Sequence, residues 1–143
     1  MQLFSHDTKA DALGRAPLFQ GLARSELVQL AKVTEDMEVK ADKILCTEGE
    51  TAREFFVIID GEVDVTRGDK HLRTLGSGEF FGEIALIEHS TRTATVTAKT
   101  PLRFFVLTSQ GFWSLIEHNP GVERKVLRAL AKRLASALDD PCG

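Results

Sequence analysis

Between residues 34 and 108 the chain is a succession of short β-forming segments separated by turn residues, and this pattern constrains the fold more than any other feature. The segment 54–60 (EFFVIID) is rich in aromatic and branched side chains, which favour strands. The next segment, 62–67 (EVDVTR), alternates polar and apolar residues, as a half-buried strand does. Gly61 lies between them and predicts a hairpin turn, because glycine adopts positive φ without steric cost. Strands this short and this closely spaced predict a sandwich, jelly roll or barrel.

Helical patterns flank these strands on both sides. Residues 9–33 repeat apolar side chains near helical spacing, and residues 109–118 and 122–138 predict two further helices with a break at 119–121. The last helix has an apolar stripe made of Val122, Val126, Leu127, Leu130, Ala131, Leu134 and Leu138. Its other face carries Glu123, Arg124, Lys125, Arg128, Lys132 and Arg133. The predicted fold class is α+β, mainly β, in three zones that form one domain: 1–33, 34–108 and 109–143.

Length and composition agree with a single soluble domain. The 143 residues suffice for one core, and 43% hydrophobic with 27% charged residues is typical of a globular protein. A formal net charge of −3 argues against a nucleic-acid partner, since phosphate contacts need a clustered positive face. Residues 1–9 hold no signal-peptide core, and the longest apolar run, 55–59, is too short to span a membrane. Cys46 and Cys142 match no metal-ligand spacing, so we expect no metal. This cysteine usage suits a reducing compartment, and we expect a cytoplasmic protein.

The segment 76–96 is the part of the chain that predicts chemistry. Its first eight residues, GSGEFFGE, hold three glycines directly before a short apolar helical turn, where unpaired N–H groups are accessible to an anion. Arg92 follows Gly82 by ten residues, so a returning loop brings its planar guanidinium to the same anion. Glu83 would repel a phosphate and therefore predicts a neutral hydroxyl pair such as a ribose 2′-OH, with Arg92 balancing its charge. The combination predicts a small ligand with one phosphate and one sugar hydroxyl.

The run FGEIAL at 81–86, followed by TRTATV at 91–96, resembles the phosphate-binding cassette of the cyclic-nucleotide-binding domain family. That family includes the regulatory subunit of protein kinase A, cyclic-nucleotide-gated channels and the bacterial catabolite activator protein. The run 55–63 resembles the family's strand-glycine-strand signature, and 119–120 its break between the last two helices, so the resemblance covers most of the chain. It implies an eight-stranded, jelly-roll-like β-roll flanked by an N-terminal helix and two C-terminal helices. It also implies a sensor that is not an enzyme and that binds cyclic AMP or cyclic GMP and no other cofactor.

By motif position, the resemblance implies a role for each cassette residue. Glu83 would bind the ribose 2′-hydroxyl, and Arg92 the exocyclic oxygen of the cyclic phosphate. Backbone N–H groups of Gly82, Ala85 and Thr93 would complete the phosphate cradle. The predicted ligand-binding set is Leu72, Gly82, Glu83, Ile84, Ala85, Arg92, Thr93 and Ala94.

The resemblance also bears on the base and on signalling. Two pairs are expected near the base: the wall Leu72 and Val96, and the lid Leu134 and Leu138. In the family a threonine at the place of Thr93 favours guanine, which keeps cyclic GMP as the alternative. Several cyclic-AMP receptors of the family also carry a hydroxyl residue there, and cyclic AMP is the expected ligand. The catabolite activator protein has hydroxyl residues where this chain has Ala137 and Leu138, which is a departure from its base contact. Ligand binding is expected to move the last helix, which would act on an effector outside this chain or form a homodimer.

Three other interpretations stay open. A ligand-free interaction module would have the same fold, but such a module would not need to keep both Glu83 and Arg92. A cupin-like enzyme would need a His-x-His pair, which the four scattered histidines do not provide. The basic face of the last helix suggests DNA, although a solvated helical face is the more common explanation. The chain ends a few residues after 138, so we expect no helix-turn-helix module within it.

Overall fold

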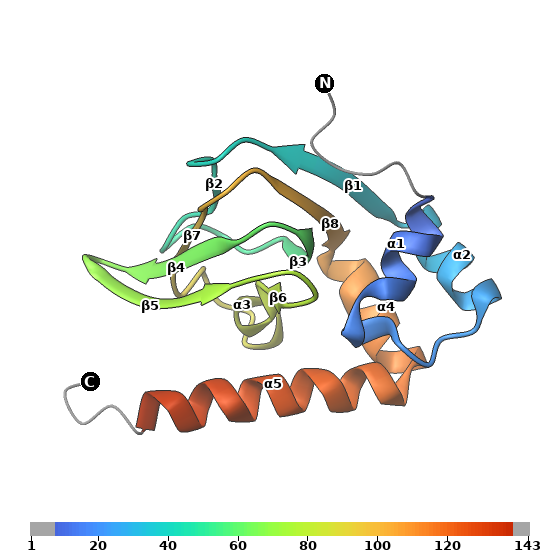
Figure 1. The fold of residues 1–143 in the computed structure, drawn as a ribbon. Coiled ribbons are helices and arrows are strands. Elements are labelled where there is room, and N and C mark those ends of the chain that lie inside the picture. Colours follow the sequence, from blue (N-terminus) through green and yellow to red (C-terminus); the bar gives the residue numbers. More distant parts are fainter. Residues whose placement is uncertain (1–7, 139–143) are drawn as a thin grey trace.

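The computed structural model describes the backbone of residues 8–138 and the side chains of residues 8–135 (Figure 1). In this part of the chain, eight strands form two four-stranded antiparallel sheets. The first sheet has the order β1-β8-β3-β6, with the bounds Thr34–Val39, Leu102–Thr108, Glu54–Asp60 and Phe80–Phe81. The second has the order β2-β7-β4-β5, with the bounds Ile44–Cys46, Thr95–Ala98, Val63–Arg67 and Lys70–Leu75. The two sheets, together with the helices around them, confirm the predicted β-roll with a mainly β fold class.

The turn at Gly61 differs from its prediction. β3 and β4 lie in different sheets, so the expected hairpin between them is wrong. Gly61 has a φ of +106°, and a Cβ there would lie 2.4 Å from the carbonyl oxygen of Pro101. The glycine therefore lets the chain cross from one sheet to the other against the β7–β8 connection. The hairpin forms one step later, where β4 and β5 pair across the turn with Arg67 opposite Lys70.

The sequence of strand β3 is continuously apolar because both faces of the strand are buried. Phe55 and Val57 belong to the core under the helices, together with Phe112 of α4. Phe56 and Ile58 point the other way, into the core between the two sheets. A strand covered on both faces gains from an unbroken apolar run, whereas the half-exposed β4 alternates.

Helices pack on the outer side of the first sheet (Figure 1). The N-terminal group consists of α1 (Lys9–Arg15), the 3-10 turn η1 (Pro17–Phe19) and α2 (Arg24–Lys32). The C-terminal group consists of α4 (Ser109–His118) and α5 (Pro120–Leu138), and α3 (Glu83–Ile87) follows β6 directly. None of the helices described in residues 8–138 has the length and apolar character needed to cross a bilayer.

Helix α5 changes its surroundings along its length. Val122 and Val126 are buried in the helix-side core. Leu127 and Leu134, which the sequence assigns to the same apolar stripe, are 59% and 62% exposed. The first half of α5 packs against the domain, while the second half runs past α3 and the β4–β5 hairpin (Figure 1). The apolar stripe is therefore buried only in part: Val122 and Val126 lie in the core, Leu130 packs against it, and Leu127 and Leu134 are exposed.

Candidate ligand-binding site

The turn between β6 and α3 depends on Gly82. Its φ is +96°, in the left-handed region that side chains with a Cβ rarely adopt. A Cβ at this position would also lie 2.9 Å from Nη1 of Arg92 and 3.1 Å from the carbonyl oxygen of Glu54. Glycine is thus required both by the backbone conformation and by the close approach of the arginine. The turn leads directly into α3, whose first N–H groups have no partner within the helix.

The side chain of Arg92 is held in place by two backbone carbonyls and an aromatic ring. Its Nη1 donates to the carbonyl oxygen of Gly82 at 3.0 Å, and its Nη2 donates to that of Glu54 at 2.7 Å. The guanidinium lies over the ring of Phe56, 5.6 Å from the centroid, and the backbone N–H of Arg92 donates to the carbonyl oxygen of Glu50 at 2.8 Å. A guanidinium has five N–H donors, so these two side-chain bonds orient the group and leave further donors for an anion.

Glu83 is buried, with 1% of the residue exposed. Its Oε1 accepts a hydrogen bond from the guanidinium of Arg133 on α5, which also donates to the carbonyl oxygen of Phe80 and lies over the Phe80 ring. The charge partner of Glu83 is therefore Arg133 and not Arg92, whose donors near the turn point to carbonyls. The second oxygen, Oε2, is buried and has no hydrogen-bond partner among the described residues. Of the two carboxylate oxygens, Oε1 thus has a hydrogen-bond donor and Oε2 has none among the described residues.

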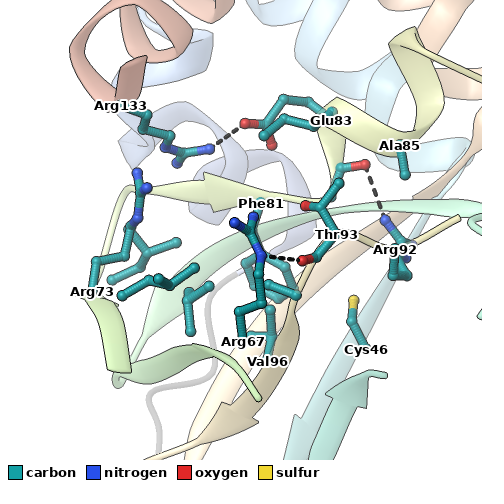
Figure 2. A pocket seen from close by; sticks show the side chains of 16 residues that line it. Cys46, Arg67, Arg73, Phe81, Glu83, Ala85, Arg92, Thr93, Val96 and Arg133 are labelled. Carbon is teal, nitrogen blue, oxygen red and sulfur yellow. Dashed lines mark hydrogen bonds and ion pairs between the residues drawn. The ribbon is translucent and has the colours of Figure 1, made fainter. Parts of the chain in front are cut away.

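All eight predicted ligand-binding residues, and Val96 with them, line one cavity of about 90 Å³ (Figure 2). The remaining lining residues, which the sequence did not single out for this site, are Cys46, Val65, Arg67, Arg73, Leu75, Phe81 and Arg133. The cavity opens to a groove of about 1100 Å³ between the β4–β5 hairpin and α5, with which it shares Leu72, Arg73 and Arg133, among others. Small-molecule sites usually enclose roughly 300–1,000 Å³. A ligand of nucleotide size therefore fits only with one end in the cavity and the other in the groove.

The mouth of the cavity is strongly basic. Figure 2 shows the guanidinium groups of Arg73 and Arg133 close together, below the carboxylate of Glu83. Partial burial lowers the pKa of Arg73, and the charge of Arg133 lowers it further. Arg67 donates from Nε to the carbonyl oxygen of Thr93 at 2.9 Å and so ties β4 to the loop that carries Arg92. Four arginines and one buried carboxylate give the site an excess of positive charge, which favours an anionic ligand.

Cys46 contributes a thiol to the cavity wall. Burial raises its pKa to about 11, against a smaller opposing effect from Arg92. At neutral pH it is therefore a protonated, weakly polar group, and a thiol is a much weaker nucleophile than a thiolate. Within residues 8–138, the His, Cys, Asp and Glu side chains form no group of three that could hold a metal ion.

Of the two residues of the expected lid, only Leu134 has a described side chain. Leu134 is largely exposed and does not line the site, whereas its neighbour Arg133 does. The side chains of Ala137 and Leu138 lie outside the described residues. The sequence missed Arg133 because its partner Glu83 is fifty residues away, and only the path of α5 brings the two together.

Known proteins share both the sequence pattern and the fold. A protein-family model described as "Cyclic nucleotide-binding domain" matches residues 36–119. The chain is 33% identical over 117 residues to a cyclic nucleotide-gated potassium channel of Rhizobium etli, covering 82% of this chain and 33% of the channel. It is 30% identical over 129 residues to a CRP-like cAMP-activated global transcriptional regulator of Mycobacterium tuberculosis, covering 87% and 58%.

The fold is also similar to that of cAMP-bound PfPKA-R, with a TM-score of 0.82 at 24% identity, covering 91% of this chain and 45% of that one. The chain spans between a third and somewhat more than half of the length of these sequence relatives.

Proposed function

Because this chain belongs to the cyclic-nucleotide-binding domain family, we propose that it is a non-enzymatic sensor whose cavity around Glu83 and Arg92 binds cyclic AMP, with cyclic GMP as the alternative. The observation that supports this most is the buried Oε2 of Glu83, an acceptor without a donor among the described residues. An unsatisfied buried acceptor costs about 1–3 kcal/mol. A ribose 2′-hydroxyl is a neutral donor, so it would satisfy this oxygen without adding a second charge.

The phosphate fits the opposite side of the same turn. Arg92 has donors to spare, and its orientation is already fixed by the carbonyls of Gly82 and Glu54. The N–H groups of Gly82, Ala85 and Thr93 are assigned to the remaining phosphate oxygens. A guanidinium that is oriented before binding loses less side-chain entropy when the ligand arrives. The base then extends past Leu72 into the groove, where the cavity and the groove meet.

The signal leaves the site through α5. Arg133 joins this helix to Glu83, so the group that is assigned to the ribose also holds the helix. A ligand that changes the contacts of Glu83 changes the free energy of this helix position relative to others, which is a population shift. The exposed Leu127 and Leu134 lie seven residues apart on one side of α5, a spacing suited to a helical partner. We assign that face either to an effector outside the chain or to the same helix of a second copy.

In this proposal the segments 1–33, 34–108 and 109–143 form one domain, and that domain works in the cytoplasm. A contact of Lys125 supports the single domain: its Nζ donates to the carbonyl oxygens of Pro17 at 2.7 Å and Gln20 at 2.8 Å and so ties the C-terminal helix to the N-terminal segment. The free thiol of Cys46 is compatible with a reducing compartment.

Isothermal titration of the full chain with cyclic AMP and cyclic GMP tests the proposal. Arg92→Ala is expected to lose a charge-assisted contact of about 1.5–3 kcal/mol, which is roughly a tenfold to hundredfold loss of affinity. Arg92→Lys should recover only part of it, because an ammonium lacks the planar fork. Arg124→Ala, an exposed change on α5 away from the cavity, is the control and should bind like the parent.

Circular dichroism must show that each variant is folded before its affinity is compared, since Arg92 also bonds two carbonyls of the protein. Absence of heat with both nucleotides up to millimolar concentration would leave a ligand-free interaction module as the better description.

A further inference from the structure

The groove between the β4–β5 hairpin and α5 gathers much of the positive charge of this protein. Seven Lys and Arg side chains line it, against the single carboxylate of Glu79. The chain as a whole has a formal net charge of −3. The rest of the chain holds eleven Lys and Arg against twenty Asp and Glu, so the groove is a concave basic region in an otherwise acidic protein.

Two of these cations have no charge partner among the described residues. Arg128 and Lys132 are exposed on α5, and no side chain of the described residues pairs with either. Arg73 on the opposite wall stands near Arg133, whose charge is balanced on the cavity side by Glu83. Lys125 differs, because two backbone carbonyls of the η1 region already accept its hydrogen bonds. Like charges held together in this way repel, and an anionic partner that enters the groove would relieve the repulsion.

The shape and the lining select among anionic partners. Arg128 and Lys132 are four residues apart and therefore lie on one side of the helix, roughly 6 Å apart along its axis. Between the two basic walls the groove is lined by apolar groups, among them Leu18, Leu72 and Ala129. Carboxylates on a peptide can meet the basic walls while an apolar side chain between them reaches this floor. A nucleic-acid duplex extends beyond the groove and would meet the acidic surface around it, and a lipid bilayer is too flat to enter a concave site.

We propose that this groove binds an acidic, partly apolar peptide segment of a partner protein. Arg73, Arg133 and Leu72 belong to the groove and to the nucleotide cavity alike, and the base is assigned to the same groove, so the two binding events are coupled by competition for part of it. That coupling rests on the proposed function, whereas peptide binding by itself does not. By linkage, a nucleotide that changes the peptide affinity by some factor has its own affinity changed by the same factor.

Fluorescence anisotropy with a labelled peptide tests the groove. The probe is a fluorescein-labelled peptide of fourteen residues in which pairs of Glu alternate with single Leu residues, and the protein is the full chain. Arg128→Glu is expected to weaken binding by roughly tenfold or more, because it places a carboxylate on the wall that should receive one. Arg124→Glu makes the same charge change on the same helix outside the groove, and it should alter binding by less than about twofold.

The same titrations distinguish failure of this inference from failure of the proposed function. The nucleotide titration of the parent chain is read by itself, and the peptide titrations of the parent and of Arg128→Glu are made without nucleotide, because Arg128 lines the groove to which the base is assigned. Saturating cyclic AMP should weaken peptide binding, and the peptide should weaken nucleotide binding by the same factor. If the nucleotide binds and the peptide does not, the groove assignment is wrong while the proposed function stands. If the peptide binds and neither nucleotide does, the proposed function is wrong and the groove remains.

Three further results would overturn the peptide assignment. Equal losses in Arg124→Glu and Arg128→Glu would show general charge attraction without a defined groove. Tighter binding of a single-stranded oligonucleotide, lost in Arg128→Glu, would point to nucleic acid. Co-sedimentation with vesicles of phosphatidylcholine and phosphatidylserine, also lost in Arg128→Glu and competing with the peptide, would point to a membrane surface.

Discussion

Replacing Arg133 by alanine should destabilise the domain more than any other single change on the exposed half of α5. The substitution removes the donor to Glu83 Oε1 and leaves a carboxylate that is 1% exposed with neither oxygen bonded by the described residues. Breaking a buried ion pair by removing one partner costs about 3–5 kcal/mol. The side chain of Arg133 is itself 17% exposed, so water can partly replace it. The lower end, about 3 kcal/mol, is therefore expected.

Thermal denaturation followed by circular dichroism measures this effect. For a domain of this size, a loss of about 3 kcal/mol lowers Tm by roughly 6–12 °C. Lys132→Ala is the matched control, because Lys132 is the adjacent, exposed cation without an ion-pair partner among the described residues, and its Tm should change little. Adding Glu83→Gln to Arg133→Ala should restore much of the loss, since the buried charge is then gone.

The reasoning fails if Arg133→Ala lowers Tm no more than Lys132→Ala does. That result would mean that Glu83 does not depend on α5 in solution. It would also remove the structural basis for a signal that passes from the ribose site to the helix.

Three other changes test the site from different directions. Arg73→Ala should lower the affinity for cyclic GMP about fivefold or more and that for cyclic AMP less, by calorimetry, because a guanidinium donates to the O6 and N7 of guanine while the N6 of adenine is itself a donor. Gly82→Ala should lower the urea midpoint further than Gly49→Ala; both have positive φ, but only at Gly82 would the new Cβ meet a neighbour, 2.9 Å from Arg92. In a Cys142→Ser background, iodoacetamide at pH 8 should alkylate Cys46 far more slowly than free cysteine, because burial raises its pKa from 9.0 to about 11. The free energy of unfolding should also fall as the pH rises from 9.0 to about 11, the pKa values of the Cys46 thiol in the unfolded and the folded chain, because the unfolded chain releases the thiol proton first.

The nucleotide cassette could be located from the sequence because its geometry is local. Gly82, Glu83 and Arg92 lie within eleven residues, and a glycine before a short helix leaves little choice of backbone path. The buried run 55–59 was likewise recognisable as a strand, although periodicity did not show that both of its faces are covered.

Contacts between distant segments were not predictable in this way. Gly61 looked like a hairpin turn because sequence shows a turn but does not show whether the strands beside it pair or part. The sequence also supplied a cation for Glu83, Arg92, on grounds of proximity. The structure supplies Arg133 instead, because the packing of α5 decides which of the basic residues reaches the cavity.

The basic residues of α5 show why a helical charge pattern alone cannot be assigned to solvent. A helix turns by about 100° per residue, so neighbouring cations on it meet different surroundings. Lys125 bonds to carbonyls of the N-terminal segment, and Arg133 bonds to Glu83. These two contacts, eight residues apart, fix both the position of the helix and its rotation. With the helix fixed in this way, Arg128 and Lys132 face the groove with no protein partner among the described residues, so their charge is available to a molecule that enters it.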